Sequence, residues 1–562
     1  MELIRITSLN QLDQYRDDWS LILEENQNTN PFIEFVWIYE WWKHFGDEYD
    51  VEIMLVKLDD KPIGFFPFIH KRQWFGHMYT FVAFGIANYM DFVVYNHLLD
   101  DVIEFVFDEI IKVKKNVVFY LHGLLESEKT HESLETYLQR RKYNFSKHRV
   151  VTPFIHLKEI ELEQFRDKRK RLHRIDKREK RLRKSGAVNF LRSSQEEMDS
   201  VFQLFEKRWK KRRTTSGFTN DKGKAFFRSL AGIQVGPMQT EIDGLYINGK
   251  MIAFQYGFLC RGRFVGYVKG YDDDFDVFGP GIILEKQKTL QCLRNAYTIF
   301  DLSIGYEPSK FELNTGEDYT SKMIFSSNSI IGKVVRHFFT LKESLLERMK
   351  KNYSFVLFIR NTIGKLLFVS RNLFSNTESK AIKEELVEYL KRVKKFFYER
   401  KKYIIYKIEK KDIPDLPDSG GYTELTIGDA VNCPSIANSH MKEVCRRIFT
   451  GYKGYYPVDC LSMNSIFWMH ERVLRIENLS YAEELHKSSA YIQDWTIRNV
   501  DKICSFMKRN SAVNTLYVSV EDGSKHKIAK LEGLGFTISK YVFYRTYYGF
   551  VKTIVKTLED SG

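Results

Sequence analysis

Residues 240–271 read TEIDGLYINGKMIAFQYGFLCRGRFVGYVKGY, and this stretch decides the fold. Its apolar and aromatic runs are interrupted at Asn248–Gly249 and Arg261–Gly262, two pairs suited to tight hairpin turns. The stretch therefore predicts three antiparallel strands in a meander. A loop with Gly279, Pro280 and Gly281 follows, and then a helix over about 282–295 and the strand YTIFDLSIG at 297–305.

Helices and strands alternate on both sides of this meander. Before it, the strand-like run EIMLVKLDDKPIGFFPFIHK (52–71) precedes DDVIEFVFDEIIKVK (100–114), whose apolar residues have helical spacing. After it, a mostly helical and basic stretch leads to a boundary at DIPDLPDSGG (412–421), and α/β alternation then resumes. We expect four parts in an α/β protein, which are 1–155, 156–330, a helical basic connector at 331–402, and 403–562.

The positive charge of the chain is concentrated in one segment. The formal net charge is +14, and Arg166 to Lys184 holds twelve Lys/Arg against three Asp/Glu. Because the rest is nearly neutral, the sequence argues against a protein that coats nucleic acid. The segment can bind a phosphorylated acceptor, an acidic membrane surface or RNA, or it can be a solvated face. It lacks interleaved aromatic residues, which disfavours RNA.

Cysteine spacing and hydropathy indicate the compartment. The six cysteines are widely spaced without a Cys-x-x-Cys pair, so we expect neither a zinc site nor a disulfide framework, and a reducing environment fits best. The first residues lack the pattern of a signal peptide, and no apolar run reaches the ~18 residues of a membrane span. We expect a cytoplasmic protein, with peripheral contact at the inner face of an anionic membrane as an alternative.

The order of these features resembles the GNAT-like acetyltransferases of bacterial cellulose and exopolysaccharide loci, the CelD-like group, which is related to the Fem peptidyltransferases. That family combines a Tyr-Asp pair, a Ser-Pro-Gly-like turn, a helix, an Asp-bearing strand and Gly-x-Glu-x-Tyr-Lys. Ser309 stands where the family has its Tyr. The matching positions are Tyr271, Asp272, Gly279, Pro280, Gly281, Asp301, Gly305, Glu307 and Lys310.

The first part of the chain carries the same resemblance. NPFIEFVWIYEWWKHFGD (30–47) is similar to the opening helix of the family, and NYMDFVV (88–94) is similar to a loop that bears an Asp, here Asp91. FEKRWKKRR (205–213), which contains Trp209, stands at the expected joint between two units. The resemblance over about residues 1–330 implies two GNAT-like units in tandem, each with its own mixed central sheet and with a shared cleft.

The resemblance implies an N-acyltransferase that uses acetyl-CoA or another acyl-CoA as donor and no metal. Such an enzyme must deprotonate an amine, hold the donor and stabilise an oxyanion. We expect Glu307, Lys310 and Asp272 to be catalytic, although a Glu–Lys pair at this spacing is often a solvated surface pair, and we favour a structural role for Asp301. The expected substrate-binding residues are Tyr271, Gly279, Pro280, Gly281, Asp91 and Trp209.

The last part of the chain resembles the second half of a GNAT domain more faintly, through AYIQDWTI (490–497) and LEGLGF (531–536). The segment from Trp495 to Phe506 has no glycine, so a pyrophosphate could not approach the backbone there as it does in that superfamily. We therefore expect a degenerate and inactive GNAT-like domain.

Three functions remain open from the sequence. The first is acyl transfer to a sugar or peptide precursor of the cell envelope or of an exopolysaccharide. The second is Fem-type transfer from aminoacyl-tRNA, which is disfavoured because the long coiled-coil insertion of some Fem enzymes is missing. The third is a non-catalytic GNAT-fold scaffold in polysaccharide assembly.

Overall fold

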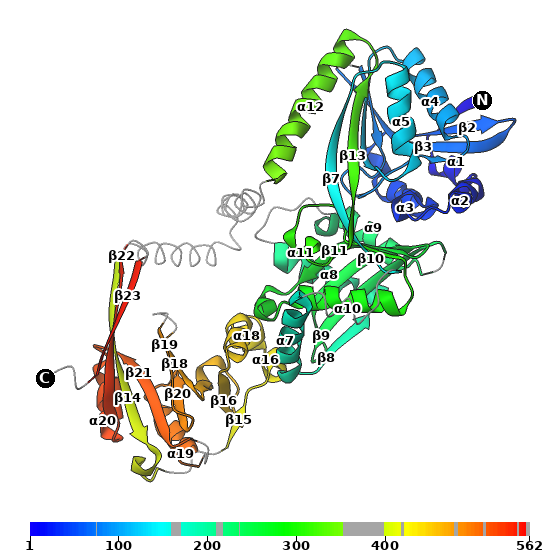
Figure 1. Cartoon of the computed structure of the whole chain (residues 1–562). Coiled ribbons are helices and arrows are strands. Elements are labelled where there is room, and N and C mark those ends of the chain that lie inside the picture. Colours follow the sequence, from blue (N-terminus) through cyan, green and yellow to red (C-terminus); the bar gives the residue numbers. More distant parts are fainter. Residues whose placement is uncertain are drawn as a thin grey trace.

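The computed structural model consists of two α/β lobes, with the N-terminal lobe above the C-terminal one in Figure 1. It describes residues 1–74, 76–158, 170–209, 217–234, 236–351, 398–416, 421–476, 481–509, 513–547 and 550–557. The α/β class with mixed sheets, which the sequence predicted, is confirmed.

One continuous sheet runs through the first 330 residues, in the order β1-β2-β3-β4-β6-β13-β7-β12-β11-β10-β9-β8, with β5 beside β3. The first unit supplies β1 (Glu2–Ile6), β2 (Val51–Leu58), β3 (Lys61–Gln73), β4 (Gly76–Phe81), β5 (Val93–Val94), β6 (Val117–Leu125) and β7 (Phe145–His156). The second supplies β8 (Val188–Arg192), β9 (Met238–Ile247), β10 (Lys250–Cys260), β11 (Arg263–Tyr271), β12 (Ile299–Asp301) and β13 (Gly316–Ser326).

The strand order reveals an internal repeat. In each unit an antiparallel run leads to one parallel pair, β4 with β6 and β11 with β12. The last strand of each unit then inserts beside the other unit: β13 lies between β6 and β7, and β7 lies between β13 and β12. The tandem arrangement is therefore confirmed, but the two separate sheets that the sequence predicted are one sheet, because the final strands are exchanged.

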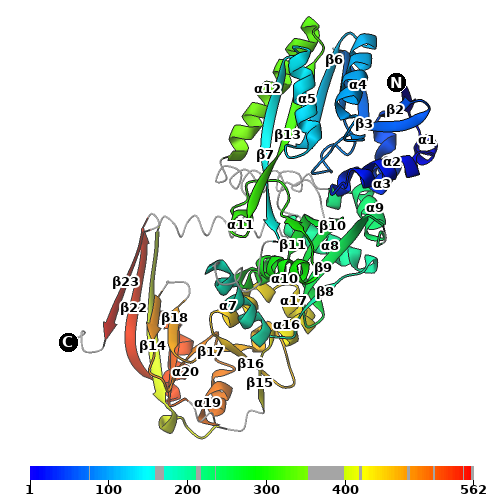
Figure 2. The same ribbon diagram turned by 45° about the vertical axis from the view of Figure 1, so that its right-hand side comes forward.

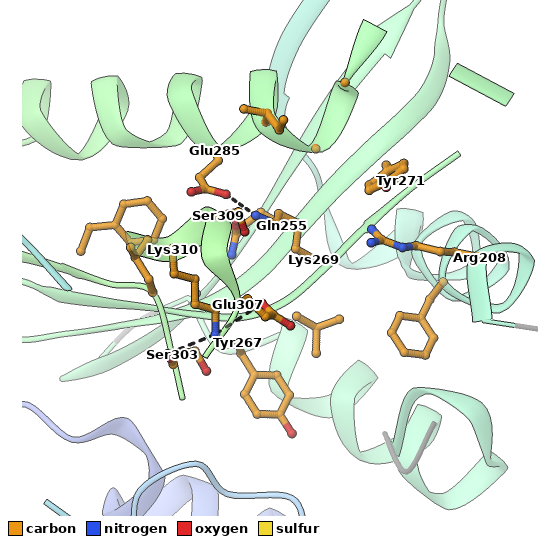
Figure 3. Close-up of a pocket in the computed structure, with 18 of the residues that line it drawn as sticks. Arg208, Gln255, Tyr267, Lys269, Tyr271, Glu285, Ser303, Glu307, Ser309 and Lys310 are labelled. Atoms are coloured by element: carbon orange, nitrogen blue, oxygen red, sulfur yellow. Dashed lines mark hydrogen bonds and ion pairs between the residues drawn. The ribbon is translucent and has the colours of Figure 1, made fainter. Parts of the chain in front are cut away.

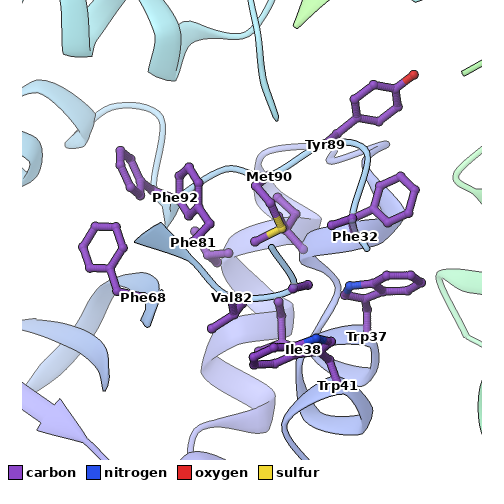
Figure 4. Packing of buried hydrophobic residues seen from close by; sticks show 14 of the residues in the cluster. Phe32, Trp37, Ile38, Trp41, Phe68, Phe81, Val82, Tyr89, Met90 and Phe92 are labelled. Carbon is purple, nitrogen blue, oxygen red and sulfur yellow. The ribbon is translucent and has the colours of Figure 1, made fainter. Parts of the chain in front are cut away.

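The two units also share a hydrophobic core. Helix α3 (Phe35–Phe45) of the first unit places Trp37 against Phe226 of α9 (Asp221–Ala231) and Phe258 of β10, each at 5.1 Å between ring centroids. Figure 4 shows the aromatic side chains that continue this core into the first unit. The other helices around the sheet are α1 (Leu9–Asp13), α2 (Arg16–Glu25), α4 (Leu99–Val113), α5 (Lys129–Arg140), α7 (Lys170–Lys184), α8 (Met198–Trp209), α10 (Pro280–Arg294), α11 (Pro308–Phe311) and α12 (Ile330–Lys351).

A buried ion pair lies where the units meet. Asp301, fully buried at the end of β12, accepts two hydrogen bonds from the Arg263 guanidinium, at 3.1 Å and 2.5 Å. It also accepts one from the hydroxyl of Tyr89 in the first unit, at 2.8 Å. Asp301 therefore holds strands together, in agreement with the structural role expected for it.

The C-terminal lobe has an eight-stranded sheet in the order β15-β16-β17-β20-β21-β14-β22-β23. Its helix α18 (Met441–Phe449) packs on the short 3-10 helix η5 (Asp273–Phe278) of the second unit, through Phe449 against Phe278 and Lys442 against Asp276. The strands are β14 (Tyr398–Glu409), β15 (Tyr422–Glu424), β16 (Lys453–Pro457), β17 (Phe467–His470), β20 (Ser489–Gln493), β21 (Thr515–Glu521), β22 (Thr537–Tyr547) and β23 (Phe550–Thr557), with a separate pair β18 (Val473–Ile476) and β19 (Tyr481–Glu484).

Helix α12 begins the expected connector. It packs along β13 and β7. Residues 352–397 of the expected connector lie outside the described residues. Among the helices that the structure describes, none is both long and apolar enough to cross a membrane.

Candidate functional site

In the part of the chain that the structure describes, three helices each connect two parallel strands and begin after the carboxyl end of the first strand. They are α4 between β4 and β6, α10 between β11 and β12, and α19 (Val500–Arg509) between β20 and β21. In α/β folds, ligands bind at the carboxyl ends of parallel strands, often with an anion at the helix N-terminus. The three junctions are therefore the places to compare.

Only α10 among these three helices begins with a glycine turn. Gly279 is its N-cap at φ +68°, a left-handed conformation that glycine adopts readily, and Pro280 is its first residue. The first turn of α10 has no acidic residue, whereas α4 begins with Asp100 and Asp101, and α19 has Asp501. A helix N-terminus carries positive partial charge and attracts an anion. In α4 and α19 the acidic side chains of the first turn supply that negative charge, whereas α10 has no such side chain in its first turn.

The sheet opens beside this turn. Strand β11 pairs with β12 only from Arg263 to Val265, and beyond that register the two strands separate. The continuation of β11, the segment after β12 and the start of α10 enclose a cavity of about 650 Å³ (Figure 3). A Cβ at Gly281 would come within 2.8 Å of the Tyr271 ring, so glycine there keeps this wall of the cavity open.

The cavity wall is strongly charged. Its cations are Arg178, Arg208, Lys269 and Lys310, and its acids are Asp276, Glu285 and Glu307. The Arg208 guanidinium lies 3.8 Å from the centre of the Tyr271 ring, and Lys269 forms an ion pair with the buried Glu285. Among the described lining residues, four cations against three acids beside a helix N-terminus favour a ligand with negative groups.

Lys310 is held by the loop after β12. Its ammonium donates to the carbonyl oxygens of Ile304 at 2.7 Å and Ser303 at 3.2 Å, and it lies 3.6 Å from a carboxylate oxygen of Glu307. Burial lowers the pKa of Lys310, and Lys269 lowers it further against the opposing effect of Glu307. Glu307 itself is more than half exposed, so it can exchange protons with solvent.

Five of the predicted site residues line this cavity, namely Tyr271, Gly279, Gly281, Glu307 and Lys310. Pro280 begins α10 next to it. Asp272 points elsewhere: it is buried, lies 2.6 Å from the Lys207 ammonium, and accepts a hydrogen bond from the Asp274 amide as the N-cap of η5. Its position stabilises the turn that leads to Gly279.

Asp91 is not among the described residues that line the cavity. Asp91 lies in the first unit, where its carboxylate accepts a hydrogen bond from the Phe92 amide and burial raises its pKa to about 7. Trp209 is the last residue of α8, directly after Arg208, and its side chain is outside the described part.

Sequence reasoning missed Arg178, Arg208, Lys269 and Glu285. Arg178 belongs to the basic segment, for which a solvated face was one interpretation, but α7 docks on α10 through the ion pair of Glu179 with Lys286 at 2.8 Å. That docking brings Arg178 to the turn, where its guanidinium would lie 2.8 Å from a Cβ at Gly279. In the sequence, Arg178 is one charged residue among many in a basic helix. Such a pattern cannot indicate which face of the helix packs against the rest of the protein.

The corresponding space in the first unit is filled. Phe81 at the end of β4 lies 5.3 Å from Phe92 and 5.9 Å from Phe68 between ring centroids, and Val82 and Met90 are buried beside them (Figure 4). The repeat therefore has an open junction in its second copy and a packed one in its first.

The junction in the C-terminal lobe has a cavity of about 720 Å³. Its lining includes Trp495 and Lys527, whose ammonium lies 4.9 Å from the centre of the Trp495 ring. The chain passes from β20 to α19 without a glycine, as the sequence indicated.

Several solved structures are similar to this chain. Solved structures with a similar arrangement include FemX (10% identity, 60% of this chain and 99% of that one, TM-score 0.41). A conserved protein of unknown function from Bacteroides thetaiotaomicron shares 15% identity over 57% of this chain and 99% of its own, with a TM-score of 0.39. A tandem GNAT protein from the clavulanic acid biosynthesis pathway shares 9% identity over 58% of this chain and 98% of its own, with a TM-score of 0.34.

No match was found among curated proteins. The sequence of residues 169–311 matches the family described as Acetyltransferase (GNAT) domain. This range contains the glycine turn and, apart from Asn88, every residue that lines the cavity beside it. The sequence of residues 169–311 is therefore similar to that of GNAT acetyltransferase domains.

Proposed function

We propose that the second unit transfers an acyl group from acyl-CoA to an amine or hydroxyl of a sugar or peptide precursor of the cell envelope or an exopolysaccharide. The observation that carries this proposal is the glycine turn of α10 at the mouth of a cationic cavity between two separating parallel strands. The first unit and the C-terminal lobe lack such a turn at their corresponding junctions.

The donor would lie along the opening between β11 and β12. The Gly281 amide at the start of α10 and the Arg178 guanidinium can hold its phosphate groups, because both are close to Gly279. The separated edge of β11, from Gly266 to Tyr271, is free of β12 and can accompany the extended part of the donor. The thioester would then face Lys310 in the short helix α11 and Glu307 at its N-cap.

In the reaction, the acceptor nitrogen or oxygen attacks the thioester carbonyl and the thiolate leaves. The proton of the acceptor goes to the Glu307 carboxylate, which is exposed enough to pass it to solvent. Lys310 adds positive charge beside the developing oxyanion while its two carbonyl partners fix its position. Asp272 acts only as a positioning residue, through the turn that it caps.

The test of this proposal is release of free CoA thiol by the full chain with acetyl-CoA and a panel of amino sugars and nucleotide-linked amino sugars. Glu307→Gln should lower the transfer rate about 100-fold, the usual contribution of a general base, without moving the melting temperature. Glu312→Gln, which changes an exposed glutamate outside the cavity, is the matched control.

Equal rates in the Glu307 variant and the control would contradict the assignment. If no acceptor reacts and acetyl-CoA does not bind, the donor class is wrong, and charged tRNA becomes the donor to test. If neither binds, the chain is a scaffold.

Acetyl-CoA should bind at one site per chain. We expect calorimetric titration of the full chain to give a stoichiometry near one. Gly281→Val should weaken binding at least 10-fold, because the new side chain meets the Tyr271 ring. Lys527→Ala in the C-terminal cavity should leave binding unchanged. A second site, or a loss of binding in the Lys527 variant, would show that the C-terminal lobe is not degenerate.

A further inference from the structure

Helix α12 has two apolar faces, and only one of them packs against other described residues. The inner face places the buried Val335 against a small cluster with Val118, Tyr120 and Ile324. Its Glu343 accepts a hydrogen bond from the Tyr120 hydroxyl at 2.7 Å and pairs with Lys322 at 2.8 Å. This face attaches the helix firmly to the sheet.

The outer face is an exposed apolar stripe. Figures 1 and 2 show α12 as the outermost element on its side of the N-terminal lobe. At about 100° per residue, the seven side chains of the stripe fall within an arc of about 100°. They are Ile330, Ile331, Val334, Phe338, Leu341, Leu345 and Met349, with Phe338 65% and Leu345 60% exposed.

Charge on α12 is segregated between the two faces. Lys333, Lys342 and Arg348 are exposed beside the stripe. The two acidic residues of the helix turn to the protein, Glu343 as described and Glu347 toward His148 at 3.4 Å. The outer surface is therefore apolar with a cationic border and has no acidic residue of its own helix.

We propose that this stripe is a membrane-binding surface that lays α12 on an anionic lipid bilayer. A helix with an apolar face and Lys/Arg beside it inserts into the headgroup boundary of such a bilayer. Since the helix is fixed to the sheet through Glu343 and Val335, insertion would hold the N-terminal lobe at the surface. This inference goes beyond the proposed reaction and does not depend on it.

Charge favours an anionic lipid surface over two other ways to cover the stripe, namely the chain segment that follows it and a second copy of the protein. The sequence that follows the stripe, from Lys350 to Thr377, has five Lys/Arg and no Asp/Glu, so it would bring like charge to the cationic border if it folded back. A second copy that docked through the same stripe would likewise place two cationic borders together. An anionic surface complements both the apolar stripe and its border.

The experiment is flotation of the full chain with vesicles of phosphatidylcholine alone or with 30% phosphatidylglycerol. At low salt we expect at least 10-fold more protein on the anionic vesicles, and high salt should reduce this difference. Phe338→Ser/Leu341→Ser/Leu345→Ser should lower binding at least 10-fold. Lys333→Gln/Lys342→Gln/Arg348→Gln should lower it to the level of phosphatidylcholine vesicles.

The matched control removes three equally exposed apolar side chains elsewhere. Leu21→Ser/Val113→Ser/Leu191→Ser changes side chains that are 54%, 64% and 54% exposed on other elements, and it should bind vesicles like the wild type. Melting curves must show that all variants are folded. The proposal is overturned if the stripe variant binds like the control, or if light scattering shows that the stripe variant abolishes self-association while vesicle binding is unchanged.

Discussion

Replacing Arg263 with methionine should destabilise the folded chain by about 3–5 kcal/mol, the usual result of removing one partner from a buried ion pair. Asp301 would remain fully buried without its cation, with the Tyr89 hydroxyl and the Ser303 amide as its hydrogen-bond donors. Because Tyr89 belongs to the first unit, the loss should loosen the junction between the two units. Chemical denaturation of the full chain measures the change.

Two further variants show whether the buried charge is the cause. Arg263→Met/Asp301→Asn removes both charges and should recover part of the loss, since the neutral amide is less costly to bury. Arg140→Met breaks an exposed pair with Glu104 and should change stability by less than about 1 kcal/mol. A loss of stability in the Arg263 variant as small as that of Arg140→Met would contradict the interpretation.

Lowering the pH from 7 to 4 should remove about 3 kcal/mol of stability through His122 alone, at 1.36 kcal/mol per pKa unit. Burial on β6, with a further effect of Lys322, lowers the pKa of His122 to about 3. In the unfolded chain the imidazole titrates near its ordinary value of about 6.5. Below that pH the unfolded state binds a proton that the folded state does not, so stability is full above pH 6.5 and falls as the pH decreases toward 3.

The pH dependence of the unfolding free energy measures this effect. His122→Leu keeps an apolar side chain beside Phe84 and Phe81 and should flatten the curve between pH 6.5 and 4. His97→Leu, at an exposed position, is the matched control and should keep the wild-type slope. If both variants have the wild-type slope, His122 is not the group responsible.

Local features of the fold could be predicted because their causes are local. Asn248–Gly249 and Arg261–Gly262 have positive φ at all four residues and form the two tight turns of the meander, β9 to β10 and β10 to β11. Gly279 and Pro280 begin α10 within three residues of the predicted start. In each case the backbone preference of one or two residues determines the structure, so no distant contact is needed.

The strand exchange could not be predicted, since it depends on pairing between residues far apart in sequence. Nothing in Gly316–Ser326 distinguishes pairing with β12 from pairing with β6 and β7, because either position buries the same apolar residues. The choice depends on contacts with strands and helices that are distant in the sequence, which a local pattern does not encode. The prediction of two separate sheets was wrong for this reason.

In the candidate site, too, the locally determined features could be predicted and those that depend on packing could not. The sequence alone determined the glycine turn and the meander before it, because each is a short run with its own conformational preference. The segment with Glu307 and Lys310 was predicted as a loop, whereas Lys310 lies in the short helix α11 and Glu307 is its N-cap. Only the tertiary structure decided that Arg178 and Lys269 join them, that Asp272 faces Lys207 instead, and that the junction of the first unit is filled by Phe81 and Phe92. These outcomes depend on how helices dock on the sheet, and docking is set by packing between segments that are distant in the sequence.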